Sequence, residues 1–133
     1  MKKRKVLMIE DDMDDRYIIE TYFADYGSSM ALKFFDGHND VIQYLNGLNK
    51  ADMPDLIVLD PGRHGHGTLQ QLKSHPVFKA IPVVVVSEVT PDSTVKEAYR
   101  LGANSFIQKP STHFLTKEKI ETFARYWLDV VEL

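Results

Sequence analysis

Five short, largely apolar runs recur along the chain, and polar stretches separate them. The runs cover residues 6–9, 32–35, 56–59, 82–86 and 105–107. A run of this length and composition indicates a strand buried on both faces, and the four consecutive valines of the fourth run favour a strand most strongly. The pattern therefore predicts five β-strands.

The longer stretches between these runs carry apolar residues at helical spacing. In the first stretch, Ile19, Tyr22, Phe23 and Tyr26 stand at positions i, i+3, i+4 and i+7, and Gly27 ends the pattern. Four further helices are predicted from similar stripes, marked by Val41, Ile42 and Leu45; by Leu69 and Leu72; by Val95, Ala98 and Tyr99; and by Ile120, Phe123, Ala124, Trp127 and Leu128. We interpret the aromatic residues on these stripes as core packing.

Strands that alternate with helices predict an α/β fold built on a parallel sheet. The crossovers between the strands are expected to be right-handed. With 133 residues and no internal repeat or linker, the chain is expected to form one domain over residues 1–133.

Composition narrows the classes of function. The chain has no cysteine, which excludes disulfides, iron–sulfur clusters and cysteine nucleophiles. A formal net charge of −3 argues against a nucleic-acid-binding module. The first apolar run is too short for a secretory signal, and no run approaches the length of a membrane span. We therefore expect a cytoplasmic protein without nucleic-acid or membrane partners.

Polar residues directly follow several of the predicted strands. In a parallel α/β sheet the carboxyl ends of the strands meet along one edge, where functional groups gather. Carboxylates, a hydroxyl group and an ammonium group are therefore expected to converge at that edge. These residues are Glu10, Asp11, Asp12, Asp60, Ser87 and Lys109.

Such a set of side chains makes chemical sense as a unit. Carboxylates that are brought together repel one another unless a cation lies among them, and oxygen ligands in this number favour Mg²⁺. An aspartate beside the metal can attack a phosphoryl group, while a lysine and a hydroxyl group hold the phosphoryl oxygens. The alternative is that these acids are helix caps and solvated loop residues.

Four segments carry a family resemblance that covers nearly the whole chain. They read VLMIEDD at 6–12, DLIVLD at 55–60, IPVVVVS at 81–87 and LGANSFIQKP at 101–110. In order and spacing they resemble the receiver domain of bacterial two-component response regulators, in its stand-alone, chemotaxis-regulator-like form. The resemblance implies a flavodoxin-like, doubly wound, five-stranded parallel sheet of order 2-1-3-4-5 with five helices, and no output domain.

The resemblance also implies roles for residues after the first and third strands. Glu10 and Asp11 take the place of the acidic pair that organises Mg²⁺, with Asp11 as the expected direct ligand. Asp60 matches the metal-bound aspartate that accepts a phosphoryl group from a histidine kinase or phosphotransfer protein. The carbonyl of Gly62 falls where the family supplies a further metal ligand.

Three more positions match residues that respond to the phosphoryl group. Ser87 matches the hydroxyl residue that moves toward the phosphoryl group on activation. Lys109 matches the lysine that pairs with the acceptor, and Phe106 matches the aromatic switch position. The resemblance further implies a cis bond between Lys109 and Pro110. Such a chain catalyses only its own phosphorylation and dephosphorylation, and it signals to a downstream protein target through surface contacts.

The sequence departs from the family pattern near the acceptor. Pro61 removes an N–H beside Asp60, and Gly67 stands seven positions after Asp60, where most receivers have a glycine one position later. Glu88 stands where the family prefers a small residue, and its carboxylate could crowd or repel a phosphate. These departures motivate an alternative function, a degenerate receiver that binds a partner without phosphorylation.

Other functions are less consistent with the sequence. His64 and His66 suggest a metal pair, although two ligands do not make a site and a solvated loop is the alternative. An enzyme that binds a nucleotide or flavin needs a phosphate cradle after a strand, where this chain has acids. A phosphatase of the haloacid dehalogenase type needs a second aspartate at the position of Gly62.

Overall fold

The computed structural model describes residues 3–27, 29–62, 65–88, 91–110 and 113–133. Its strands form one parallel sheet in the order β2-β1-β3-β4-β5. The strands are β1 (Arg4–Ile9), β2 (Met30–Phe35), β3 (Leu56–Leu59), β4 (Val83–Ser87) and β5 (Ser105–Gln108). The predicted α/β fold and its 2-1-3-4-5 strand order are confirmed.

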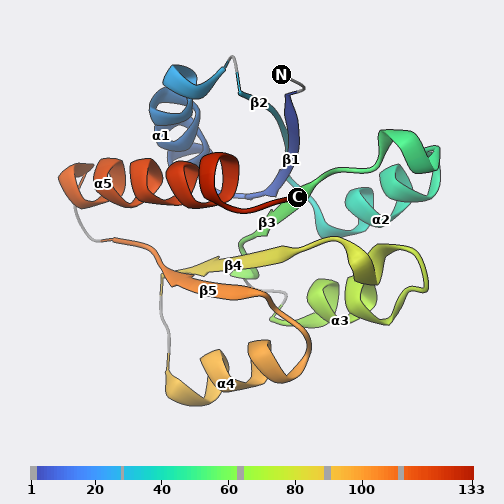
Figure 1. Cartoon of the computed structure of the whole chain (residues 1–133). Coiled ribbons are helices and arrows are strands. Elements are labelled where there is room, and N and C mark those ends of the chain that lie inside the picture. The colour runs from blue at the N-terminus through green and yellow to red at the C-terminus, as the bar shows by residue number, and fades with distance from the viewer. Residues whose placement is uncertain (1–2, 28, 63–64, 89–90, 111–112) are drawn as a thin grey trace.

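The connections between the strands are helical. The α-helices of the described residues are α1 (Met13–Phe23), α2 (His38–Asn46), α3 (Gly67–Ser74), α4 (Asp92–Arg100) and α5 (His113–Ala124), and α5 continues into a π-helical turn, Arg125–Val130. Figure 1 shows α1 and α5 together on one side of the sheet, with α2, α3 and α4 on the other. The sheet is therefore covered on both faces.

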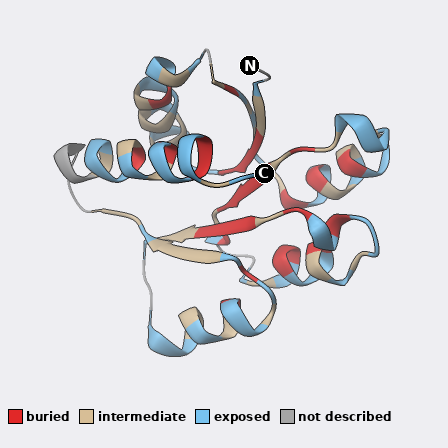
Figure 2. Cartoon of the chain, viewed as in Figure 1, coloured by how far each residue is buried: buried red, intermediate tan, exposed pale blue. Residues whose placement is uncertain are grey.

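The strands build two apolar layers because successive side chains point to opposite faces. One layer joins Leu7 and Ile57 to α2, α3 and α4, and the other joins Met8 and Val58 to α1 and α5. Figure 2 shows the buried residues concentrated in the strands and on the helix faces turned toward them. Helices cover both faces of the sheet, which explains why the sequences of the central strands are continuous apolar runs.

Some element ends differ from the sequence prediction by a few residues. The apolar stripe that reaches Tyr26 is α-helical only as far as Phe23, and the 3₁₀ turn Ala24–Tyr26 completes it. Strand β4 begins at Val83 because Pro82 has no N–H to donate to a neighbouring strand, although its carbonyl accepts a hydrogen bond from the N–H of Ile57 at 3.0 Å.

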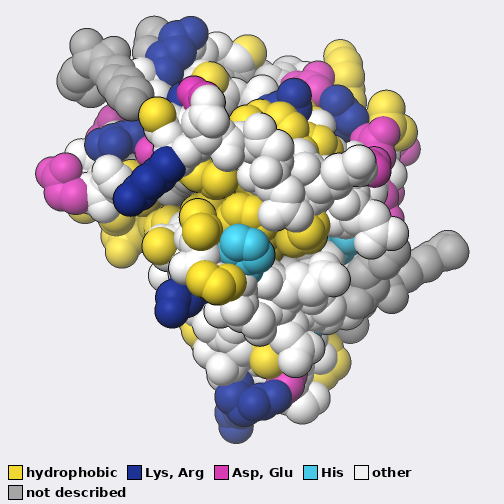
Figure 3. Space-filling view, turned by 90° about the vertical axis from the view of Figure 1, so that its right-hand side faces the viewer, with side chains coloured by type: hydrophobic (Ala, Val, Ile, Leu, Met, Phe, Trp, Pro, Cys, Tyr) yellow, Lys and Arg dark blue, Asp and Glu magenta, His cyan; other side chains and the backbone are white. Residues whose placement is uncertain are grey.

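The surface carries both signs of charge. On the side of the molecule drawn in Figure 3, hydrophobic side chains gather near the middle, and basic and acidic side chains lie around them. Within the described residues, no helix has the length and apolar content needed to cross a lipid bilayer.

Candidate functional site

Three ionisable side chains are held at the carboxyl edge of the sheet by strand-like hydrogen bonds. Glu10, Asp60 and Lys109 each stand one residue beyond a strand. Their N–H groups nevertheless donate to neighbouring strands: Glu10 to the carbonyl of Phe35 at 3.0 Å, Asp60 to Ile9 at 3.0 Å and Lys109 to Ser87 at 2.8 Å. The backbone of the sheet therefore positions all three residues.

The alternation of side chains along the strands directs these groups to the same face. Met8, Val58 and Ile107 belong to the apolar layer under α1 and α5. Glu10, Asp60 and Lys109 lie two positions further along their strands and point to that face as well. They line a cavity of about 140 Å³, which lies between this face and helices α1 and α5.

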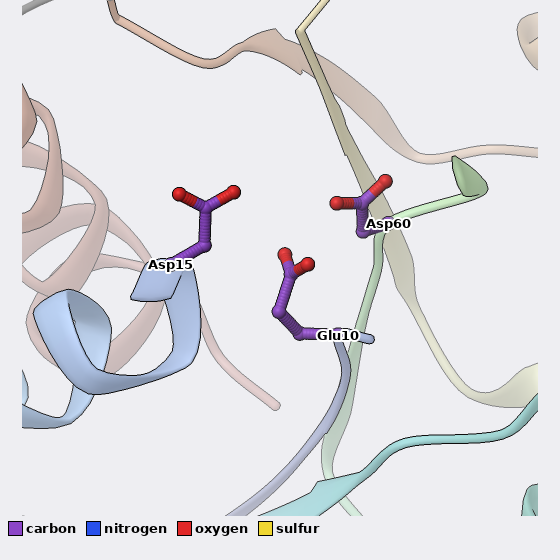
Figure 4. Close-up of side chains that lie close together, drawn as sticks. All are labelled: Glu10, Asp15 and Asp60. Atoms are coloured by element: carbon purple, nitrogen blue, oxygen red, sulfur yellow. The ribbon is translucent and has the colours of Figure 1, made fainter. Parts of the chain in front are cut away.

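The Lys109 ammonium is the centre of the cluster. Its Nζ atom donates to Glu10 Oε2 at 2.8 Å, to Asp15 Oδ2 at 2.7 Å and to Asp60 Oδ2 at 2.5 Å. An ammonium group has three N–H donors, so the three carboxylates use all of them. Figure 4 shows the three carboxyl groups gathered around one space, with Asp15 reaching it from α1.

Asp15 is a site residue that the sequence analysis missed. Functional groups were expected directly after each strand, whereas Asp15 lies in the first turn of α1. Asp12 caps this helix, and its Oδ1 accepts hydrogen bonds from the N–H groups of Asp14 at 2.9 Å and Asp15 at 3.0 Å. The signal in the sequence was an acid one helical turn beyond a capping aspartate.

Burial controls the electrostatics of the cluster. Glu10 is only 2% exposed, and this burial, together with a hydrogen bond to Asp60, raises its pKa to about 7. Burial alone would lower the pKa of Lys109, but hydrogen bonds to Asp15, Asp60 and Glu10 outweigh it and raise that pKa above its ordinary value. Lys109 is therefore a stable cation, and the ionised cluster carries two negative charges in excess.

The acids at this edge are of the kind that binds a hard divalent cation. Carboxylate oxygens of Glu10, Asp15 and Asp60 lie within 4.8 Å of one another, around the Lys109 ammonium that all three contact. Oxygen donors with excess negative charge suit Mg²⁺. Two of the predicted ligands, Glu10 and Asp60, belong to this group.

Asp11 and Gly62 lie beside the cluster. Asp11 is exposed, and its carboxylate is so close to Gly62 that a Cβ atom on that glycine would lie 3.4 Å from Oδ2. Gly62 adopts a φ of 51°, and its N–H donates to Asp60 Oδ1 at 2.9 Å. This hydrogen bond supplies Asp60 with a donor although Pro61 has none. Asp11 and Asp60 therefore flank the same glycine.

The remaining predicted residues lie on or directly after β4 and β5. Ser87 ends β4, and the exposed Glu88 follows it at the rim of the cavity that Asp60 also lines. Phe106 is half-buried on β5, and its N–H donates to the hydroxyl of Tyr99 at 3.0 Å. The structure thus places a hydroxyl residue and the aromatic position on the two strands nearest Lys109.

The expected cis bond before Pro110 is wrong. Every described peptide bond is trans, including Lys109–Pro110. The trans form is the default for a proline bond, and no turn is needed here because Lys109 reaches Asp60 directly from the strand end.

The histidine pair suggested by the sequence receives no support as a metal site. His64 lies outside the described residues, and Nε2 of His66 donates to the carbonyl of Thr94 at 3.1 Å. This hydrogen bond links the start of α3 to α4. His66 therefore has a structural contact at the side of the loop.

Comparisons with known proteins identify the family of the chain. Residues 6–121 match the family described as the response regulator receiver domain. The chain is 28% identical to the chemotaxis protein CheY-3 of Vibrio cholerae over 123 residues, which cover 90% of this chain and 91% of that protein. It is 29% identical to a probable methanogenesis regulatory protein of Methanothrix harundinacea, over 92% of this chain and 83% of the relative.

Solved structures share the fold over nearly the full length. The phosphorylated cyanobacterial phytochrome response regulator RcpA superposes with a TM-score of 0.89 at 26% identity, over 99% of both chains. The Mn²⁺-bound form of the response regulator Rcp1 superposes with a TM-score of 0.87 at 23% identity, over 98% of both chains. Because the family match spans residues 6–121 and the fold is shared over nearly the whole length, the chain belongs to the family of response regulator receiver domains.

Proposed function

We propose that the protein is a stand-alone receiver that accepts a phosphoryl group on Asp60 and signals through surface contacts with a downstream protein. The donor is a histidine kinase or a phosphotransfer protein, and the expected setting is the cytoplasm. The observation that carries the proposal is the contact between Asp60 and Lys109 at 2.5 Å, in the lining of a cavity of about 140 Å³.

The chemistry follows from the roles of these two side chains. A carboxylate oxygen of Asp60 attacks the phosphorus atom, and a new O–P bond forms while the bond between phosphorus and the donor's histidine nitrogen breaks. The leaving imidazole keeps the electron pair and takes up a proton. Lys109 donates hydrogen bonds to the phosphoryl oxygens, where charge accumulates in the transition state. Ser87 ends the neighbouring strand β4, where it pairs with Gln108, the residue before Lys109.

Mg²⁺ is the proposed cofactor. We assign its ligands to Glu10, Asp11, Asp60 and the carbonyl of Gly62. The position of Asp11 and Asp60 on either side of Gly62 supports this set. When bound, the ion neutralises carboxylate charge and lets an anionic donor approach. The fold is also shared with a response regulator whose structure was obtained in an Mn²⁺-bound form.

Phosphorylation with a small donor tests the proposal directly. The protein is incubated with acetyl phosphate and Mg²⁺, and intact mass spectrometry should show a gain of one phosphoryl group. Asp60→Asn should abolish the gain, as should removal of Mg²⁺ with a chelator. If the folded wild-type protein gains no phosphoryl group from acetyl phosphate or phosphoramidate, the proposed acceptor function is wrong.

The second candidate is a degenerate receiver that binds its partner without phosphorylation. Its support is Glu88, an exposed acidic residue that lines the same cavity as Asp60. If wild type and Asp60→Asn bind the downstream partner equally well, with or without acetyl phosphate, this second function is the correct one.

A further inference from the structure

The contact between Asp15 and Lys109 has no role in the chemistry proposed so far. It joins two residues 94 positions apart, from the first turn of α1 to the end of β5, at 2.7 Å. This distance is as short as that from Lys109 to Glu10, which is 2.8 Å. Asp15 is also the most exposed of the three carboxylates on this lysine, at 27% against 12% for Asp60 and 2% for Glu10.

Lys109 has no unused donor while the three carboxylates hold it. A phosphoryl oxygen can therefore receive a hydrogen bond from Lys109 only if one carboxylate releases its own. Asp60 loses its negative charge when it becomes an acyl phosphate, so its hold on the ammonium weakens during the reaction. Asp15 keeps its charge throughout. It therefore competes with the phosphoryl group for Lys109 in the transition state and in the product.

Resting on the proposed phosphoacceptor function, we propose that Asp15 is a positioning residue that acts through Lys109. It ties the ammonium to helix α1 and thereby slows phosphorylation of Asp60. Asp15→Asn keeps the size of the side chain, removes its charge and weakens a charge-assisted hydrogen bond. The rate of phosphorylation at saturating acetyl phosphate should then rise about three- to tenfold.

Asp14→Asn is the matched control for this variant. Asp14 precedes Asp15 in the same helical turn, is exposed, and forms no ion pair among the described residues. The two variants change the net charge equally, so a general effect of charge on the anionic donor would appear in both. We expect Asp14→Asn to change the rate less than about twofold. Asp15→Glu, which restores the charge, should return the rate toward that of the wild type.

Two measurements separate positioning from other roles. If Asp15 acts through Lys109, its effect should disappear when Lys109→Gln is combined with Asp15→Asn. If Asp15 were instead a direct metal ligand, Asp15→Asn would weaken Mg²⁺ binding more than about tenfold in an amide chemical-shift titration. If Asp15 is a positioning residue, Asp15→Asn should change the Mg²⁺ affinity by less than about threefold and should speed phosphorylation. A role confined to fold stability would also leave the Mg²⁺ affinity nearly unchanged, but phosphorylation would not become faster.

The outcomes separate this inference from the proposed function. If wild-type protein is not phosphorylated at all, the acceptor function fails. If wild type is phosphorylated but Asp15→Asn reacts at the same rate or more slowly, or if its effect persists without Lys109, the positioning role of Asp15 is overturned.

Discussion

Glu10 is a buried acid whose charge should destabilise the protein when no divalent cation is present. Burial and a hydrogen bond to Asp60 raise its pKa from an ordinary 4.5 to about 7. The folded protein therefore keeps the Glu10 proton up to about pH 7, whereas the unfolded chain loses it near pH 4.5. Between these values the folded state binds more protons than the unfolded state, so the free energy of unfolding falls as the pH rises. Above about pH 7 Glu10 is ionised in both states, and the destabilisation has its full size.

The magnitude follows from the size of the pKa difference. A rise from 4.5 to about 7 corresponds to about 3 kcal/mol of destabilisation in the ionised form. Glu10→Gln removes this cost, and the attraction of Lys109 at 2.8 Å is already included in the raised pKa. We therefore expect the free energy of unfolding of the variant to exceed that of wild type by up to about 3 kcal/mol at pH 8 and by much less at pH 5.

Urea unfolding in the presence of a chelator measures this difference. The single tryptophan, Trp127, is 8% exposed in the core and provides the fluorescence signal. Glu118→Gln is the control, because Glu118 is exposed on α5 and its substitution should change stability by less than about 0.5 kcal/mol at either pH. A Glu10→Gln variant no more stable than wild type at pH 8, or equally stabilised at pH 5 and pH 8, would refute the burial argument.

Three further predictions concern the proposed metal ligand Asp11, the exposed acid Glu88 and Gly102, a glycine with positive φ. Asp11→Asn should abolish the amide chemical-shift changes that millimolar Mg²⁺ produces at the ends of β1 and β3; retention of these shifts would remove Asp11 from the ligand set. Glu88→Ala should speed phosphorylation less than about fivefold, because Glu88 is exposed and its charge is screened, and a slower rate would contradict repulsion. Gly102→Ala should lower the free energy of unfolding by about 1–3 kcal/mol, since the φ of Gly102 is 105° and a Cβ atom there would lie 3.0 Å from Lys73 Cγ. Gly67→Ala is the control, because a Cβ atom at Gly67 would have no atom within 4 Å outside its chain neighbours and its own helix. Equal unfolding free energies in the two variants would refute the strain at Gly102.

Local pattern was sufficient to predict the strands and three groups of the site. The apolar runs indicate burial directly, because a strand covered on both faces is apolar throughout. Glu10, Asp60 and Lys109 each follow such a run, and the ends of parallel strands necessarily meet at one edge. The fold class and the core of the site were therefore predictable from short stretches of the chain.

Tertiary structure decided which acids contact the lysine. Glu10 and Asp11 are neighbours in sequence, yet Glu10 is 2% exposed and Asp11 lies at the surface beside Gly62. Glu10 directly follows β1 and points to the face that α1 and α5 cover, whereas Asp11 lies one residue further beyond the strand end and is exposed. The packing of α1 on that face brings Asp15 to Lys109, a contact across 94 positions that no local pattern contains.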